Sequence, residues 1–132
     1  NNILVIHGPN MNLIGHKFIT SSSNITLDKI NKYLKKTSAG YNCKLKIHQT
    51  NSQSKAVKII QRNRNKIFNI IIFPRSWQES GYALKDIFDI LNIPLITIST
   101  GEKVGLLNGC CNICENDIYK SIDQAFLYIS KN

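Results

Sequence analysis

The cysteines are the residues whose type and spacing first suggest chemistry, because Cys110, Cys111 and Cys114 lie close together in the sequence. A Cys-x-x-Cys pair commonly provides half of a zinc site. A zinc site needs about four ligands, however, and no second pair of Cys or His stands at suitable spacing. With Cys43, these residues are interpreted as small core side chains of a protein in a reducing compartment, and no metal site is expected.

Positive charge is the second feature that suggests a function. The chain has 17 Lys and Arg against 8 Asp and Glu, a formal net charge of +9. Such a charge is typical of nucleic-acid binders, and Arg75 and Trp77, expected in one exposed loop, could contact RNA or DNA. The alternative is that A+T-rich codons supply much of the lysine and that most cations lie on solvated helix faces. Trp77 could equally pack against a neighbouring subunit.

The elements that would position these residues follow from the periodicity of apolar side chains. Apolar runs and alternation predict five strands, at 2–7, 43–48, 67–73, 93–100 and 109–114. Apolar faces at helical spacing predict helices at 26–38, from 52 or 54 to the polar turn at 62–66, at 80–92 and at 117–130. The 132 residues suffice for one hydrophobic core, which indicates a single domain over 1–132.

Regular alternation of strand and helix predicts the fold class. We expect an α/β protein, a flavodoxin-like three-layer sandwich with a five-stranded parallel sheet in the order 2-1-3-4-5. Ligands of such sheets bind beyond the carboxyl ends of the strands, where the winding direction reverses. That rule selects the loops 8–23 and 74–80, with 99–102 beside them. No apolar run approaches the roughly 20 residues of a membrane-spanning helix, so a location in the cytoplasm or an organelle matrix is expected.

The opening segment resembles the start of a known enzyme family. Residues 3–15 read Ile-Leu-Val-Ile-His-Gly-Pro-Asn-Met-Asn-Leu-Ile-Gly, similar to the strand and Gly-Pro-Asn-Leu-Asn-Leu-Leu-Gly turn of type II 3-dehydroquinate dehydratases. Further similar segments follow in the family's order, at 48–51, 83–86 and 93–96. The resemblance implies an enzyme without cofactors, assembled as trimers grouped into dodecamers, that eliminates water from 3-dehydroquinate through an enolate.

That elimination needs a base for a carbon-bound proton, a donor to the enolate oxygen and an acid for the leaving hydroxyl. By the resemblance, the family's Tyr base falls on Ser22, and the Arg that favours its deprotonation falls on Lys17. A Ser hydroxyl forms no accessible anion near neutral pH, so the base is expected to be missing. The family's substrate-contacting Asn falls on Phe73 and its acid His on Glu79, which could still donate a proton if buried.

The loop after the fourth strand departs from the family in the same way. By the resemblance, a family His falls on Ser99, and the Ser whose loop grips the substrate carboxylate falls on Gly101, with Thr100 between them as a further substrate-binding position. The family's Arg falls on Leu106. The chain is also about a dozen residues shorter than the family pattern between 107 and 109. The retained positions are Asn10, Asn12 and Asp86, where Asn10 would hold the water that stabilises the enolate or simply form a turn, and where Asp86 would contact substrate or serve subunit packing.

Three hypotheses remain open from the sequence. The first is a dehydroquinase-like protein that has lost most catalytic residues and acts through assembly or by binding a partner or small anionic ligand. The second is a divergent active dehydratase whose base comes from Tyr82 or a neighbouring subunit. The third is a basic protein that contacts nucleic acid. In each case a soluble homo-oligomer, a trimer or dodecamer, is expected from the resemblance.

Overall fold

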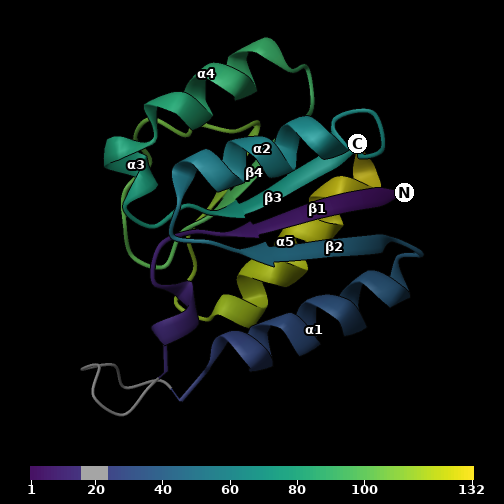
Figure 1. Cartoon of the computed structure of the whole chain (residues 1–132). Coiled ribbons are helices and arrows are strands. Elements are labelled where there is room, and N and C mark those ends of the chain that lie inside the picture. Colours follow the sequence, from purple (N-terminus) through teal and green to yellow (C-terminus); the bar gives the residue numbers. More distant parts are fainter. Residues whose placement is uncertain (16–23) are drawn as a thin grey trace.

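Five parallel strands form one sheet in the order β2-β1-β3-β4-β5, as the alternation of strands and helices predicts (Figure 1). The structure, a computed structural model, describes residues 1–15 and 24–132. Its strands are β1 (Asn2–His7), β2 (Lys44–Gln49), β3 (Asn69–Phe73), β4 (Leu95–Ile98) and β5 (Cys111–Ile113). Its helices are η1 (Met11–Leu13), α1 (Leu27–Gly40), α2 (Gln53–Asn63), α3 (Trp77–Ser80), α4 (Tyr82–Ile90) and α5 (Ile118–Lys131).

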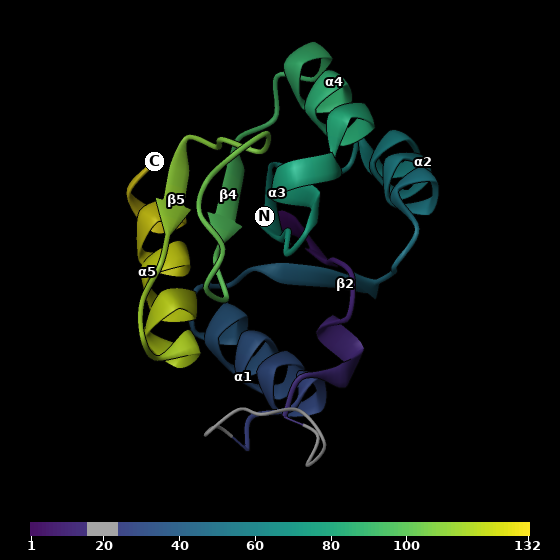
Figure 2. The same cartoon turned by 90° about the vertical axis from the view of Figure 1, so that its left-hand side faces the viewer.

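The helices cover both faces of the sheet, which gives the three layers of a flavodoxin-like fold (Figures 1 and 2). On one face, Ile3, Val5 and Ile71 pack with α1 and α5. On the other face, Leu4 and Ile6 pack with α2, α3 and α4. The alternate residues of β1 thus enter two separate cores, which is why its apolar run is continuous. Each fully buried side chain of this kind contributes about 1.5–3 kcal/mol to folding.

Side-chain caps begin three of the helices at the positions that the sequence indicates. The hydroxyl of Thr26 accepts from the Lys29 N–H at 3.4 Å, and that of Ser52 accepts from the Lys55 N–H at 3.2 Å. Asp117 caps α5 through the Tyr119 N–H at 2.9 Å. These caps fix where the three helices begin, so the loops that lead into α1, α2 and α5 have defined ends.

Two expectations about local structure are wrong in part. The helix expected at 80–92 is present as α4, but the expected loop at 74–80 contains a separate short helix, α3, over Trp77–Ser80. Only two of the four cysteines contact the core: Cys43 and Cys111 are half-buried and pack against it, whereas Cys110 and Cys114 are exposed. The physical reason is that β5 spans only Cys111–Ile113 at the edge of the sheet, so its flanking cysteines lie beyond the covered strand.

The described residues contain no cluster of three or more His, Cys, Asp or Glu side chains that could hold a metal ion. Within the same ranges, no helix has the length and hydrophobicity that crossing a bilayer requires.

Candidate functional site

The carboxyl ends of β1, β3 and β4 meet at one edge of the sheet, the edge formed by the strand ends and not by the outer strands β2 and β5. Figure 2 turns this edge toward the viewer. Gly8 follows β1 and donates its N–H to the Phe73 carbonyl at 2.9 Å. A Cβ at Gly8 would lie 2.8 Å from the carbonyl oxygens of Phe73 and Pro74, so only glycine allows this approach of the two loops. The Gly8-Pro9 turn therefore draws the loops after β1 and β3 together.

The backbone of Asn10 forms part of this turn. It has a left-handed conformation, with φ 68°, and its N–H donates to Asn51 Oδ1 at 3.0 Å. The Leu13 N–H in turn donates to the Asn10 carbonyl at 2.9 Å. Asn10 is thus a turn residue of the kind that tolerates positive φ, whatever else its exposed side chain contacts.

Phe73 is buried at the end of β3, and its ring stacks on that of His7, with centroids 4.6 Å apart. His7 Nε2 lies 2.8 Å from Asn31 Oδ1, an arrangement in which the ring donates a hydrogen bond. Its other nitrogen, Nδ1, is buried and has no hydrogen-bond partner among the described residues. Burial lowers the pKa of His7 to about 4, against a smaller opposing effect of the Asn31 hydrogen bond. His7 is accordingly a neutral, buried histidine near neutral pH.

The loops after β3 and β4 are joined by Glu102. One carboxylate oxygen, Oε1, accepts from the Arg75 N–H at 3.2 Å. The other, Oε2, accepts from the Thr100 N–H at 3.1 Å and from the Thr100 hydroxyl at 3.0 Å. The Thr100 hydroxyl also accepts from Arg75 Nη1 at 2.9 Å. The Glu102 carboxylate therefore accepts hydrogen bonds from three donors, which lie together at the carboxyl ends of β3 and β4.

Ser99 and Gly101 close the same loop upon itself. The Ser99 hydroxyl donates to the Glu102 carbonyl at 2.6 Å and accepts from the Gly101 N–H at 3.0 Å. Gly101 has φ 126°, in the region that favours glycine. The Ser99 hydroxyl and the Gly101 N–H thus both form hydrogen bonds within this turn.

Gln78 fixes the segment that follows. Its side-chain oxygen accepts from the N–H groups of Gly105 and Leu107 at 2.8 and 2.9 Å, and its Nε2 donates to the Leu107 carbonyl at 2.9 Å. The Leu106 N–H donates to the main-chain carbonyl of Gln78 at 2.9 Å. Because Gln78 is buried, it anchors residues 105–107 to α3.

These groups line two cavities. One, of about 510 Å³, lies between α3 and the loop after β4 and is lined by Arg75, Ser76, Gln78, Glu79, Thr100, Glu102, Lys103, Val104 and Gly105. The second, of about 300 Å³, lies on the β5 side of the same loop and includes Ser99, Gly101 and Asn112. Among the described residues, neither cavity is lined by a His or a Tyr. The charged side chains that line the larger one are Arg75, Glu79, Glu102 and Lys103.

The structure thus brings Glu79, Ser99, Thr100 and Gly101 to this edge of the sheet, while Phe73 points into the core. Glu79 is exposed, so it is not the buried carboxyl group that the sequence allowed for. Asp86 lies exposed on α4, and Asn12 lies exposed in η1. Lys17 and Ser22 fall outside the described residues. Leu106 is held by Gln78 through its backbone.

One expectation at this edge is wrong. Trp77 is not part of an exposed loop: it begins α3, is 3% exposed and packs within its own chain in the core of Leu4 and Ile6. Gln78 and Glu102 are the residues that the sequence analysis did not single out. Glu102 could have been found as an acidic side chain directly after the Thr100-Gly101 turn, whereas no sequence signal marks Gln78 as buried.

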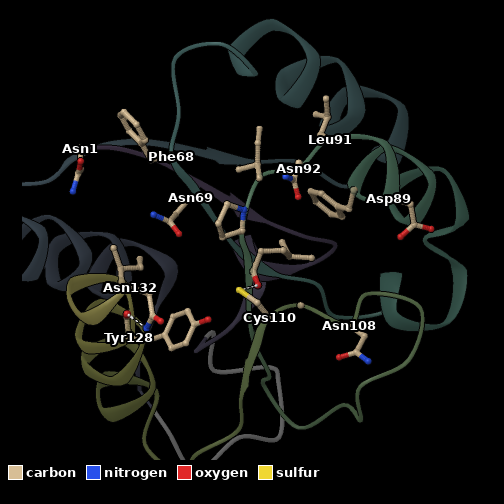
Figure 3. A pocket seen from close by; sticks show the side chains of 16 residues that line it. Asn1, Phe68, Asn69, Asp89, Leu91, Asn92, Asn108, Cys110, Tyr128 and Asn132 are labelled. Carbon is tan, nitrogen blue, oxygen red and sulfur yellow. Dashed lines mark hydrogen bonds between the residues drawn. The ribbon is translucent and has the colours of Figure 1, made fainter.

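A separate cavity, of about 670 Å³, lies at the amino ends of the strands (Figure 3). Figure 3 shows Tyr128 and Cys110 on one side of it and Phe68 and Leu91 on another. Cys110 Sγ lies 3.2 Å from the Leu95 carbonyl. Interaction with the Cys110 thiol is the first cause of a raised pKa at Tyr128. The lining is largely asparagine and apolar, and Asp89 at its rim is paired with Lys85 at 2.8 Å.

Comparison with known proteins gives a consistent result. The sequence profile of a family described as dehydroquinase class II matches residues 1–102. The 3-dehydroquinate dehydratase of Buchnera aphidicola subsp. Baizongia pistaciae is 36% identical over 97 residues, which are 74% of this chain and 63% of that protein. The 3-dehydroquinate dehydratase of Caldanaerobacter subterraneus subsp. tengcongensis is 32% identical over 103 residues, 78% of this chain and 70% of that protein. The matched part of this chain thus spans about two thirds of these relatives.

The fold similarity extends further than the sequence similarity. The type II dehydroquinase from Propionibacterium acnes superimposes with a TM-score of 0.82 at 18% identity, over 99% of this chain and 97% of that one. The profile match, by contrast, ends at residue 102, within the loop after β4. The segment after Glu102 therefore keeps the fold beyond the point at which the profile match ends.

Proposed function

This chain belongs to the class II dehydroquinase family, and we propose that it keeps the family's fold with little or no 3-dehydroquinate dehydratase activity, acting instead through assembly or ligand binding. The observation that carries the proposal is the contact of Glu102 with Arg75 and Thr100. An anionic substrate would have to compete with a carboxylate of the chain itself for these donors.

Electrostatics at this site disfavours the binding of a second anion. An external carboxylate gains from backbone and hydroxyl donors only if they are free or satisfied by water. At this site the donors already face the Glu102 carboxylate, which is tethered within the same loop and so acts at high effective concentration. A second carboxylate beside it would also meet like-charge repulsion. Arg75 adds positive charge, but its Nη1 donates to Thr100.

The positions that would carry proton transfer support the same proposal. By sequence correspondence, Ser22 stands where the family has its Tyr base, and Glu79 where it has its acid His. Loss of one general acid or base typically lowers a rate by about 100- to 10,000-fold. Two such losses would leave very slow turnover even if the substrate were bound.

A working dehydratase is the second candidate, favoured by the names of the relatives. It would need another base. The candidate in this chain is Tyr82, at the first position of α4, which is 69% exposed. The two candidates are separated by mixing purified protein with 3-dehydroquinate and following the enone absorbance of the product. Turnover by the unmodified protein at a rate within about 100-fold of that of an active dehydratase would refute the proposed loss of activity.

Self-association is the further part of the proposal. Tyr82 and Ile90 of α4 and Phe68 before β3 are large apolar residues that are 69%, 72% and 63% exposed. Exposed apolar side chains of this size are common where subunits pack together. Size-exclusion chromatography with light scattering tests this part directly, because a monomeric mass at micromolar concentration would contradict it.

A further inference from the structure

The positive charge of this chain is concentrated in one part of the sequence. Residues 29–78 contain no Asp or Glu but hold 12 of the 17 Lys and Arg residues. Codon bias accounts for abundant lysine, yet it does not predict that acidic residues are absent from fifty consecutive positions. Strand β2 and helix α2 lie within this segment, and the structure shows where their positive side chains come together.

Strand β2 forms one edge of the sheet, with β1 as its neighbour (Figures 1 and 2). Lys46 pairs in register with Leu4, and His48 with Ile6. Since Leu4 and Ile6 belong to the core beneath α2, the side chains of Lys46 and His48 lie on the α2 face of the sheet. The face of β2 turned toward α2 is therefore polar.

At the end of α2, this polar face opens into a cavity of about 620 Å³. Its lining residues are Lys46, Ile47, His48, Arg62, Asn63 and Lys66. Two lysines, one arginine and one histidine thus line a single cavity, and no acidic residue is among the lining residues that the structure describes. The two ion pairs found in the described part of the chain, Asp28 with Lys32 and Asp89 with Lys85, involve none of them.

One of these cations is held in place by a buried side chain. Lys46 Nζ donates to Asn63 Oδ1 at 3.1 Å, and Asn63 Nδ2 donates to the Ile59 carbonyl at 2.8 Å. Asn63 is 9% exposed, so its amide is fixed by α2 and orients Lys46. Lysines that merely protect a sheet edge from aggregation require charge, but they do not require such a fixed partner.

The cations also act on one another. The pKa of His48 is lowered, first by burial and then by the positive charges of Lys46 and Arg62. Lys46 and Arg62 therefore both lie close enough to His48 for their positive charges to act on its ring. A multiply charged anion at this point would relieve the mutual repulsion of the cations.

We propose that this cavity binds a small ligand carrying a di- or triphosphate group, contacted by Lys46, Arg62 and Lys66. The volume is that of a site for one small molecule, and the charges converge on one point. Phosphate oxygens accept several charge-assisted hydrogen bonds at once, which matches two lysines and an arginine better than a single carboxylate would. The proposal concerns a cavity that shares no residue with those around Glu102, so it stands whether or not dehydratase activity remains.

Calorimetric titration of the full chain with inorganic tripolyphosphate at physiological salt tests the proposal. We expect Arg62→Gln and Lys46→Gln each to weaken binding by about fivefold to tenfold, the usual effect of losing one charge-assisted contact. Arg64→Gln is the matched control, because it removes the same charge from a residue outside the cavity whose guanidinium donates to the Gln61 carbonyl at 2.6 Å. The control should bind within twofold of the unmodified protein.

Several outcomes would overturn the proposal. They are the absence of binding at millimolar tripolyphosphate, equal weakening by Arg62→Gln and Arg64→Gln, or single-stranded RNA binding that tripolyphosphate does not displace. Arg62 is exposed, so its substitution keeps the fold even if Lys46→Gln disturbs Asn63. A shift of the His48 ring resonances on titration, accompanied by a rise in the pKa of His48, would locate the anion in the cavity.

Discussion

Glu102 Oε1 accepts a hydrogen bond from the backbone N–H of Arg75 at 3.2 Å, and this contact joins the loop after β4 to the loop after β3. Arg75 has a left-handed backbone, with φ 53°, which costs energy for a residue other than glycine. The carboxylate and the Thr100 hydroxyl hold both ends of this residue, through its N–H and its guanidinium. The edge of the sheet is thus stabilised by contacts within the chain itself.

Replacing Glu102 with Gln should destabilise the protein by about 1–2 kcal/mol, because it removes the charge from hydrogen bonds to Arg75 and Thr100. Urea unfolding measures the change, and hydrogen exchange at the Arg75 and Thr100 amides should accelerate. Glu115→Gln, at an exposed position after β5, is the control and should change stability by no more than about 0.5 kcal/mol. Equal stability of the two variants would show that the Glu102 contact contributes nothing.

Gln78→Leu should cost about 2–4 kcal/mol, because it leaves the Gly105 and Leu107 N–H groups and the Leu107 carbonyl without their partner. Thermal unfolding gives the loss, and amide exchange should show it concentrated at residues 105–107. Gln124→Leu adds the same apolar group to an exposed position of α5 and should leave stability nearly unchanged. Normal protection at Gly105 and Leu107 in Gln78→Leu would contradict the anchoring role of Gln78.

Stability should fall as the pH is lowered from 6.5 to 4 because of His7. The pKa of His7 falls from 6.5 to about 4 on folding, so in this window the unfolded chain binds a proton that the folded chain excludes. The full contribution is present above pH 6.5, and its loss by pH 4 amounts to about 3 kcal/mol. Denaturant unfolding across this range measures the slope.

The variant His7→Gln should remove most of that slope, whereas His48→Gln should remove only a smaller part, because His48 is much less buried. The burial that lowers the His7 pKa follows from its position at the end of β1, stacked on Phe73. An NMR titration in which the His7 ring takes up its proton near pH 6.5 would exclude this explanation.

Much of the fold is predictable from the sequence because β1 and β3 are continuous apolar runs that only a doubly covered sheet can bury. The caps at Thr26 and Ser52 are also visible in the sequence, since their hydroxyls precede apolar helical faces. The division of residues 77–90 into two helices at Gly81 is not visible in the sequence. It depends on the close approach of Gly81 to Trp77, since a Cβ at Gly81 would lie 2.5 Å from the Trp77 carbonyl oxygen.

The candidate site is less predictable, since its contacts join residues far apart in the sequence. Arg75 and Glu102 are 27 positions apart, as are Gln78 and Gly105. The sequence predicts an exposed Trp77 because this residue stands between Ser76 and Gln78, although it starts a short helix over the core of Leu4 and Ile6. The exposure of Cys110 and Cys114 is not predictable, because β5 is shorter than its apolar residues suggest.

The most direct test of the central claim is the initial rate of enone formation from 3-dehydroquinate, with the dehydratase of Caldanaerobacter subterraneus measured beside this protein as a positive control. The proposed loss of both base and acid predicts a rate lower than the control's by about 10,000-fold or more. The double variant Lys17→Arg with Ser22→Tyr should raise the rate if the base alone is limiting. Turnover by the unmodified protein within about 100-fold of the control would contradict the account.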